Sequence, residues 1–130
     1  MSPCPCGSQK QFSECCEPYI NSRKSAETPE ILMRSRYSAY SLANIDYIQK
    51  TMCGKAAKNY DPITAHAWAS SVHWIDLVIK HTSKIKKASG TVTFIAHFSE
   101  NGKENYICEK SHFKKIKGLW FYIDGEKPLA

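Results

Sequence analysis

The 130-residue sequence has no long hydrophobic run, and no stretch approaches the roughly 18–20 apolar residues of a membrane span. Its first six residues, Met-Ser-Pro-Cys-Pro-Cys, also lack the apolar segment of a secretory signal. These absences predict a cytoplasmic protein that does not associate with a membrane. The thiols of such a protein are expected to stay reduced.

The common catalytic motifs are also missing. The six glycines are scattered and form no phosphate-binding loop, and no Gly-x-Ser-x-Gly sequence is present. Nothing near Cys53 or Cys108 would activate either thiol, so both are interpreted as ordinary thiols. The sequence therefore favours a protein that is not an enzyme. Its one catalytic candidate is Glu109, for the reason given below.

Arginine is scarce, with three residues against fifteen lysines in a chain of net charge +6. Lysine suits non-specific attraction to phosphate or acidic surfaces, whereas base readout prefers the arginine fork. Six lysines form what we call the lysine rim, because a meander would bring them to one end of its sheet: Lys84, Lys86, Lys87, Lys114, Lys115 and Lys117. The lysine rim is interpreted either as a weak site for nucleic acid or an acidic protein surface, or as a solvated edge that prevents sheet aggregation.

Cysteine, in contrast, is abundant for a reduced chain, and four of the six cysteines lie within the first sixteen residues. Cys4 and Cys6 are separated by one residue, and Cys15 and Cys16 are adjacent. Four thiolates complete the tetrahedral coordination of a zinc ion and leave no position for a reacting water. The cluster therefore predicts one structural zinc ion per chain. Two disulfides or an iron–sulfur cluster are the alternatives, although adjacent cysteines bond to each other only with strain.

The composition changes after the first part of the chain. Residues 1–25 show no apolar periodicity and are too few to form a core, so a metal ion, disulfides or docking must hold them. Residues 26–130 are predicted to form one α+β domain. Its helices are expected to begin at Thr28-Pro29 and at Asp61-Pro62, where a capping side chain precedes a proline. A shorter helical piece is expected to restart at Asn44 and Asp46.

Four segments rich in β-branched and aromatic residues follow the helices, at 74–82, 91–99, 104–113 and 119–124. Asn101-Gly102 predicts a two-residue hairpin turn, because both positions accept positive φ. Lys117-Gly118 marks a second tight turn of two or three residues. Because the turn length is not fixed, the sequence does not decide which side chains of the last strand lie on the helix side of the sheet. Helices followed by an antiparallel meander indicate an α+β fold with the helices packed on one face of the sheet.

One carboxylate falls within the apolar face of this sheet. Pairing through Asn101-Gly102 places Phe94 opposite Glu109 and surrounds Glu109 with apolar side chains. A carboxylate in such surroundings must pair with a cation, bind a proton or serve a ligand. We interpret Glu109 first as the ion-pair partner of Arg34 or Arg36 on the first helix. The alternatives are a pocket acid for proton transfer and a solvent-exposed group.

Four aromatic residues are candidates for the wall of a pocket around Glu109. They come from the first helix and from the first and last strands: Tyr37, Trp74, Trp120 and Tyr122. Such rings can stack on a planar ligand. The alternative, that they are ordinary core residues, also fits the sequence.

Three segments resemble those of a known bacterial family. Cys4-Pro5-Cys6-Gly7-Ser8 with Cys15-Cys16 is similar to the SEC-C motif, a zinc-binding element named after the C-terminus of the SecA translocase. The segments 32–40 (LMRSRYSAY) and 120–125 (WFYIDG) resemble two signatures of the YchJ family. The resemblance implies a zinc element followed by a nuclear-transport-factor-2-like domain. In that fold a strongly curved antiparallel sheet wraps over helices and leaves a cone-shaped cavity.

The sequence departs from the family pattern in two places. Gln9 stands where the SEC-C motif usually has glycine, at a position that binds no metal. Longer members end with a second SEC-C element, whereas this sequence stops at Ala130, so a role that needs two zinc elements is not expected. The family brings no established activity with it.

Two functions are compatible with these features. The first is a binding or adaptor module, in which the zinc element binds a protein partner, as the similar element does in the translocase, and the lysine rim contacts an acidic or RNA partner. The second is a small-molecule-binding protein or an acid–base enzyme that uses the cavity, with Glu109 as the inward carboxylate. A homodimer formed through the sheet, common for this fold, is a further expectation.

We expect the purified protein to contain close to one zinc ion per chain, because four thiolates fill its coordination sphere. Elemental analysis of the native protein measures this content. A content far below one ion per chain, together with oxidised cysteines, would support the two disulfides instead.

Overall fold

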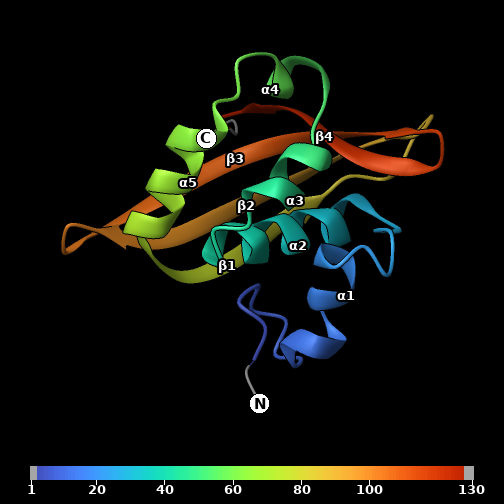
Figure 1. The fold of residues 1–130 in the computed structure, drawn as a ribbon. Helices are drawn as coiled ribbons and strands as arrows, with labels where there is room; N and C mark the ends of the chain where they lie inside the picture. The colour runs from blue at the N-terminus through green and yellow to red at the C-terminus, as the bar shows by residue number, and fades with distance from the viewer. Residues whose placement is uncertain (1–2, 128–130) are drawn as a thin grey trace.

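The computed structural model of this protein describes residues 3–127, so residues 1–2 and 128–130, at the ends of the two predicted domains, lie outside it. A short 3-10 helix and five α-helices precede four β-strands (Figure 1). Their bounds are Phe12–Glu14 (η1), Glu17–Ile20 (α1), Pro29–Ser41 (α2), Ile45–Lys50 (α3), Gly54–Lys58 (α4), Pro62–Ser71 (α5), His73–Thr82 (β1), Ser89–Glu100 (β2), Lys103–Ile116 (β3) and Leu119–Glu126 (β4). None of these helices is both long and apolar enough to cross a membrane.

The helix starts predicted from capping residues are confirmed. The Thr28 hydroxyl accepts a hydrogen bond at 3.2 Å from the backbone N–H three residues further on, at the start of α2. The side chains of Asn44 and Asp61 cap α3 and α5 in the same manner. Capping signals do not reveal α4, because Cys53 precedes it without a side-chain hydrogen bond.

The strands form one antiparallel sheet in the order β1-β2-β3-β4, which confirms the predicted meander. Asn101 and Gly102 make the expected two-residue turn, with φ of 54° and 79°. Phe94 lies opposite Glu109, as the sequence predicts, so Glu109 belongs to the apolar face of the sheet.

The length of the second turn determines which side chains of β4 point toward the helices. Lys117-Gly118 forms a loop of two residues, since Ile116 pairs with Leu119. The side chains of Trp120 and Tyr122 are consequently turned toward the helices, and Trp120 is only 5% exposed.

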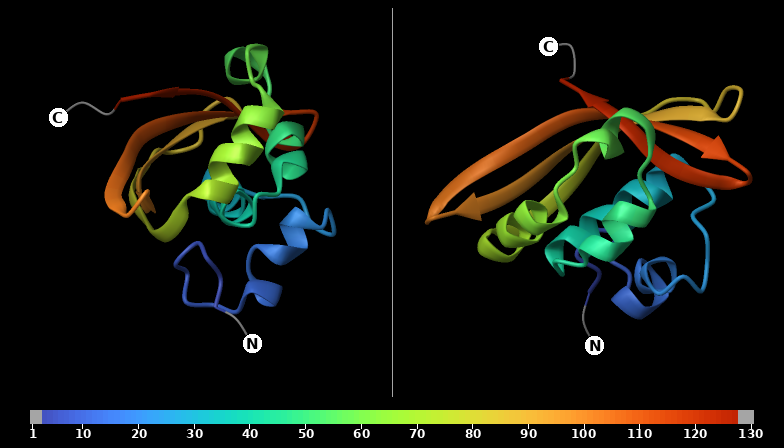
Figure 2. Two further views of the ribbon diagram at one scale, coloured as in Figure 1. Left: turned by 60° about the vertical axis from the view of Figure 1, so that its left-hand side comes forward. Right: turned by 45° about the horizontal axis from the view of Figure 1, so that its top comes forward.

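The sheet is strongly curved, and its helices lie on the concave side. Register shifts interrupt the β1–β2 pairing at two points and the β3–β4 pairing at one, and such bulges increase local twist. Figure 2 shows the sheet bending around α2, α3 and α5. The predicted α+β fold with a curved, cone-shaped sheet is therefore confirmed.

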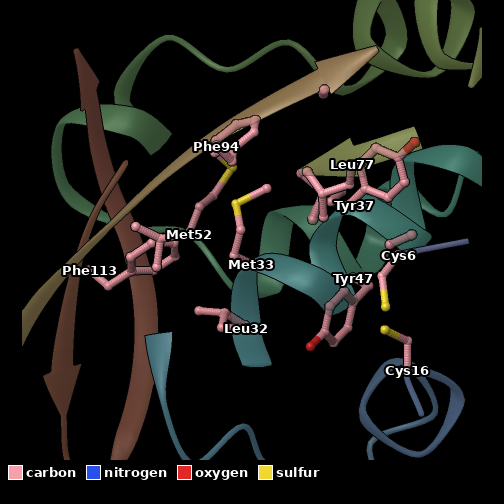
Figure 3. Close-up of a cluster of buried hydrophobic side chains, with 14 of the residues drawn as sticks. Cys6, Cys16, Leu32, Met33, Tyr37, Tyr47, Met52, Leu77, Phe94 and Phe113 are labelled. Carbon is pink, nitrogen blue, oxygen red and sulfur yellow. The ribbon is translucent and has the colours of Figure 1, made fainter. Parts of the chain in front are cut away.

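The core lies between α2 and the concave face of the sheet (Figure 3). Leu32 and Met33 of α2 share one buried cluster with Phe94 and Phe113 of the sheet, and all four are at most 8% exposed. Cys4, Cys6 and Cys16 belong to the same cluster, and Figure 3 shows the Cys6 and Cys16 sulfurs side by side at its edge. The N-terminal element thus extends the core of the second part of the chain.

Candidate metal centre and ligand cavity

Four cysteine sulfurs converge near the N-terminus. The ligand atoms of Cys4, Cys6, Cys15 and Cys16 all lie within 4.8 Å of one another. Cys6 Sγ is 3.6 Å from Cys15 Sγ, which is 3.9 Å from Cys16 Sγ. Four thiolates that bind zinc at about 2.3 Å have their sulfurs about 3.8 Å apart. The cluster therefore fits a tetrahedral metal ion, and these separations exceed the roughly 2.05 Å of a disulfide bond.

A small hairpin and a helix start bring the two cysteine pairs together. Pro3 pairs with Gln11 across the hairpin, and the Cys4 N–H donates to the Lys10 carbonyl at 2.8 Å. Gly7, with φ of 81°, turns the chain after the first pair. The second pair lies between η1 and α1. Local backbone structure thus holds both pairs in place.

Two serine hydroxyl groups contact the sulfurs. Ser8 Oγ lies 3.1 Å from Cys15 Sγ, within the hairpin element itself. Ser38 Oγ of α2 lies 3.4 Å from Cys4 Sγ. Outer groups of this kind orient metal ligands and tune their basicity. Because Ser38 belongs to α2, the cysteine cluster is connected directly to that helix.

Arg34 lies beside the cysteine cluster and does not line the cavity described below. Its Nη1 donates to the Cys6 carbonyl at 3.0 Å and approaches Cys6 Sγ at 3.9 Å, while its Nε donates to Glu30 at 3.0 Å. The pKa of Cys6 is held well below its usual range, chiefly by a hydrogen bond from the Cys16 thiol. A guanidinium next to this readily ionised thiol favours the thiolate form that binds metal.

The second site is a cavity between α2, α5 and the concave face of the sheet. Its volume is about 180 Å³, and it is partly open to solvent. Five predicted pocket residues line it: Arg36, Tyr37, Trp74, Glu109 and Tyr122. The remaining wall consists of Met33, Tyr40, Trp68, Phe94, Ala96, Ile107 and Ser111.

Glu109 is held in the cavity wall by two hydroxyl groups. Ser111 Oγ donates to Glu109 Oε2 at 2.6 Å, and Tyr122 Oη donates to the same oxygen at 2.9 Å. Gly125 of β4 leaves room for this arrangement, because a Cβ there would lie 2.5 Å from both Glu109 Oε2 and Tyr122 Oη. The other carboxylate oxygen, Oε1, receives no hydrogen bond from the described residues.

Arg36 lines the same cavity without pairing with Glu109. Its Nη1 donates to the Ile48 carbonyl at 2.9 Å and to Thr51 Oγ1 at 2.7 Å, at the C-terminal end of α3. Burial lowers the pKa of Arg36 below its ordinary value. The predicted ion pair is wrong: within residues 3–127, Glu109 lies within 4.0 Å of neither arginine of α2.

Tyr122 lies between the two charged groups. The Arg36 guanidinium carbon is 4.7 Å from the centroid of its ring, and its hydroxyl donates to Glu109. The backbone of Tyr122 donates to the Thr51 carbonyl at 2.9 Å and accepts from the Cys53 N–H at 3.0 Å, so the chain after α3 fixes its position. Burial, and then the Glu109 charge, raises the pKa of Tyr122, which keeps its hydroxyl protonated.

Aromatic rings form the rest of the cavity wall. The ring centroid of Trp74 is 5.6 Å from that of Tyr37, 6.2 Å from that of Tyr40 and 5.3 Å from that of Trp68. Burial raises the pKa of Tyr37 to about 12, so this wall is uncharged. The wall predicted from the sequence did not include Tyr40, although Tyr40 follows Tyr37 by three residues on α2 and therefore lies on the same side of the helix. No local signal places Trp68 of α5 against β1.

Trp120 does not line this cavity and belongs to the buried core, which is the alternative to the pocket wall that the sequence left open. Its Nε1 donates to the Glu27 carbonyl at 3.2 Å. It lines a separate hollow of about 270 Å³ together with Leu32 and Tyr47. Trp120 is the second residue of β4, so it lies near the turn and away from the cavity.

The two halves of the lysine rim lie at the same end of the sheet, as predicted. The Lys115 N–H donates to the Ala88 carbonyl at 2.7 Å, which joins the two lysine segments. All six lysines are exposed, and Lys84 and Lys86 line an open hollow of about 700 Å³. A binding role for the lysine rim stays a prediction.

Comparison with known families identifies both parts of the chain. The family model described as "YchJ, middle NTF2-like domain" matches residues 28–125, and the SEC-C motif model matches residues 2–18. The chain belongs to the YchJ family. The curved sheet over helices and the N-terminal cysteine cluster are the two features that the family resemblance implies.

Solved structures share the fold of this YchJ family member. A SEC-C motif protein from Rhodopseudomonas palustris is 37% identical, and the match covers 98% of this chain and all of that one, with a TM-score of 0.89. A SEC-C motif protein from Psychrobacter arcticus is 27% identical, covering 100% and 85% of the two chains, with a TM-score of 0.85. A protein from Exiguobacterium sibiricum, named as a calcium/calmodulin-dependent kinase II association domain, is similar in fold alone. It is 11% identical over 78% of this chain and 90% of that one, with a TM-score of 0.58.

Gln9 has φ of 70°, in the left-handed region that favours glycine, which accounts for the glycine usual at this place in the motif. We expect Gln9→Gly to raise the free energy of unfolding by about 1 kcal/mol, because a side chain makes this conformation unfavourable by about that amount. Urea unfolding of the metal-loaded protein measures the change. Gln11→Gly is the matched control, since Gln11 has φ of −70° and should lose stability. Stabilisation by both changes, or by neither, would contradict the prediction.

Gly125 keeps space free for the Glu109 carboxylate. We expect Gly125→Ala to lower the free energy of unfolding by about 1–3 kcal/mol through overpacking. The loss should shrink when Glu109 is also replaced by alanine, since the displaced carboxylate is then gone. A double-mutant cycle by chemical denaturation checks this, and equal losses in the two backgrounds would refute it.

Proposed function

We propose that this protein binds a small molecule in the cavity between α2, α5 and the sheet, and that a structural zinc ion in the cysteine cluster keeps α2 in place. The observation that carries the proposal is that Arg36 and Glu109 both line the cavity and do not neutralise each other. Buried charges without a counter-charge are costly, and such groups concentrate at functional sites.

The size and lining of the cavity support this function. A cavity of about 150 Å³ can hold benzene, so this cavity of about 180 Å³ accommodates one aromatic ring. Tyr37, Trp68 and Trp74 provide aromatic surface, while Arg36 and Glu109 provide polar groups that orient a ligand. An apolar pocket with a few convergent polar groups is typical of small-molecule sites.

The cysteine cluster would serve structure, because its four thiolates leave no open position on a zinc ion. Cys4, Cys6, Cys15 and Cys16 would hold the ion. Arg34 and Ser38 of α2 contact this cluster, and Arg36 and Tyr37 of the same helix line the cavity. The metal centre and the ligand site are thus connected through one helix.

Partner binding is the second candidate function. The cysteine element packs against α2 through its buried cysteines and leaves several residues exposed to solvent: Pro3, Gly7, Gln9, Lys10, Ser13 and Glu14. This exposed surface is where a protein partner would bind. Binding of this partner stays a prediction. Binding of a nucleic acid or an acidic surface to the lysine rim, and a homodimer formed through the sheet, also stay predictions.

The proposed function is tested with a panel of neutral, single-ring compounds titrated into the metal-loaded, ¹⁵N-labelled full chain. We expect chemical-shift changes at cavity residues such as Ala96 and Ile107 and at the indole N–H groups of Trp68 and Trp74. The Trp120 indole, which lies outside the cavity, should stay unchanged.

A variant that fills the cavity provides the control. Ala96→Leu adds volume to the cavity wall and should abolish these shifts, whereas Ile95→Leu on the opposite face of the same strand should keep them. The spectrum of each variant establishes that it is folded. Shifts that survive Ala96→Leu in a folded protein would overturn the proposed function. So would the absence of any shift in the original chain both with these rings and with charged aromatic compounds.

A further inference from the structure

We propose that the ligand of this cavity is an aromatic zwitterion: a ring joined to neighbouring carboxylate and ammonium groups, as in an aromatic α-amino acid. The inference rests on the proposed small-molecule-binding function and adds the chemical class of the ligand. Its basis is that the cavity holds one cationic and one anionic group, each with an unused edge, next to an aromatic wall.

Arg36 provides the site for the carboxylate. The residue is only 5% exposed, and among the described residues its Nη1 alone makes hydrogen bonds, to Ile48 and Thr51. Its Nε and Nη2 lie on one edge of the guanidinium and form the fork that donates to both oxygens of a carboxylate. The Tyr122 ring, 4.7 Å from the guanidinium carbon, packs against the guanidinium group.

Glu109 provides the site for the ammonium group. Both hydroxyl donors, Ser111 and Tyr122, bind its Oε2, and within residues 3–127 no donor binds Oε1. These two hydrogen bonds to a charged acceptor fix the carboxylate in the wall. Oε1 therefore remains as an acceptor for a ligand cation.

The two sites share one neighbour, Tyr122. Tyr122 touches both of them, Arg36 through its ring and Glu109 through its hydroxyl. A simple anion would satisfy Arg36 but bring negative charge toward Glu109, and a simple cation would do the reverse. A zwitterion compensates both charges at once, which favours it over either.

The remaining wall suits the ring of such a ligand. Tyr37, Tyr40, Trp68 and Trp74 present neighbouring aromatic faces and edges, and Phe94 lies on the sheet side of the cavity. Aromatic pairs of this kind prefer edge-to-face or offset contacts. The ring would thus lie among these side chains while the head group faces Arg36 and Glu109.

A deletion series of ligands tests this inference without changing the protein. L-phenylalanine carries both charged groups, 3-phenylpropanoate lacks the ammonium group, and 2-phenylethylamine lacks the carboxylate. Isothermal titration of each compound into the metal-loaded full chain gives the affinities. We expect each deletion to weaken binding by about 10- to 100-fold, the effect of one hydrogen-bonded charge.

A variant identifies which protein group each charge contacts. Glu109→Gln keeps the shape of the side chain and removes its charge. It should weaken the binding of L-phenylalanine and 2-phenylethylamine about tenfold or more and leave 3-phenylpropanoate unaffected or improved. Glu100→Gln, at the far end of β2 and outside the cavity, is the matched control and should change none of the three affinities.

Three results would overturn the inference. If 3-phenylpropanoate binds as tightly as L-phenylalanine, the ligand class is a plain anion; if 2-phenylethylamine does so, it is a plain cation. If none of the three binds while the neutral rings still shift Ala96 and Ile107, the zwitterion is wrong and the small-molecule-binding function stands. If the neutral rings also fail, the proposed function itself is wrong.

Discussion

Helix α2 is buried on two opposite sides, and both candidate sites depend on this double packing. One side contributes Leu32 and Met33 to the core against the sheet. The other meets the cysteine cluster through Arg34 and Ser38. Because apolar and hydrogen-bonding contacts hold the helix from both sides, the cavity residues that it carries have little freedom to move. A metal ion at the cysteines would therefore act on the cavity through the helix.

The separation of two opposite charges in the cavity follows from their different anchors. Arg36 is anchored to the end of α3, whereas Glu109 is anchored to hydroxyl groups of the sheet. The Tyr122 ring lies between them, so neither group can neutralise the other without losing its own hydrogen bonds. The desolvation of both charges lowers the stability of the folded state. Such an arrangement is stable because each charge keeps at least two hydrogen bonds, and it leaves an edge of each group for a ligand.

Much of the fold and part of the site could be predicted, because the signals are local. Capping at Thr28 and the Asn101-Gly102 turn depend on neighbouring residues, and the turn alone sets the register that turns Glu109 inward. The arginines could not be assigned in this way. Arg34 and Arg36 are two residues apart on one helix, and only the packing of other elements decides which partner each one meets. Trp120 was equally undecidable, since its place depends on a turn length and on the segment before α2.

The sequence by itself determined the α+β order, the cysteine cluster and the inward carboxylate, since spacing and turn chemistry act over a few residues. Only the tertiary structure decided what surrounds that carboxylate. It placed Ser111 and Tyr122 on Glu109, opened space for it at Gly125 and directed Arg36 to the end of α3. These contacts join residues far apart in the chain, so they depend on how the curved sheet and the helices pack, which no local signal specifies.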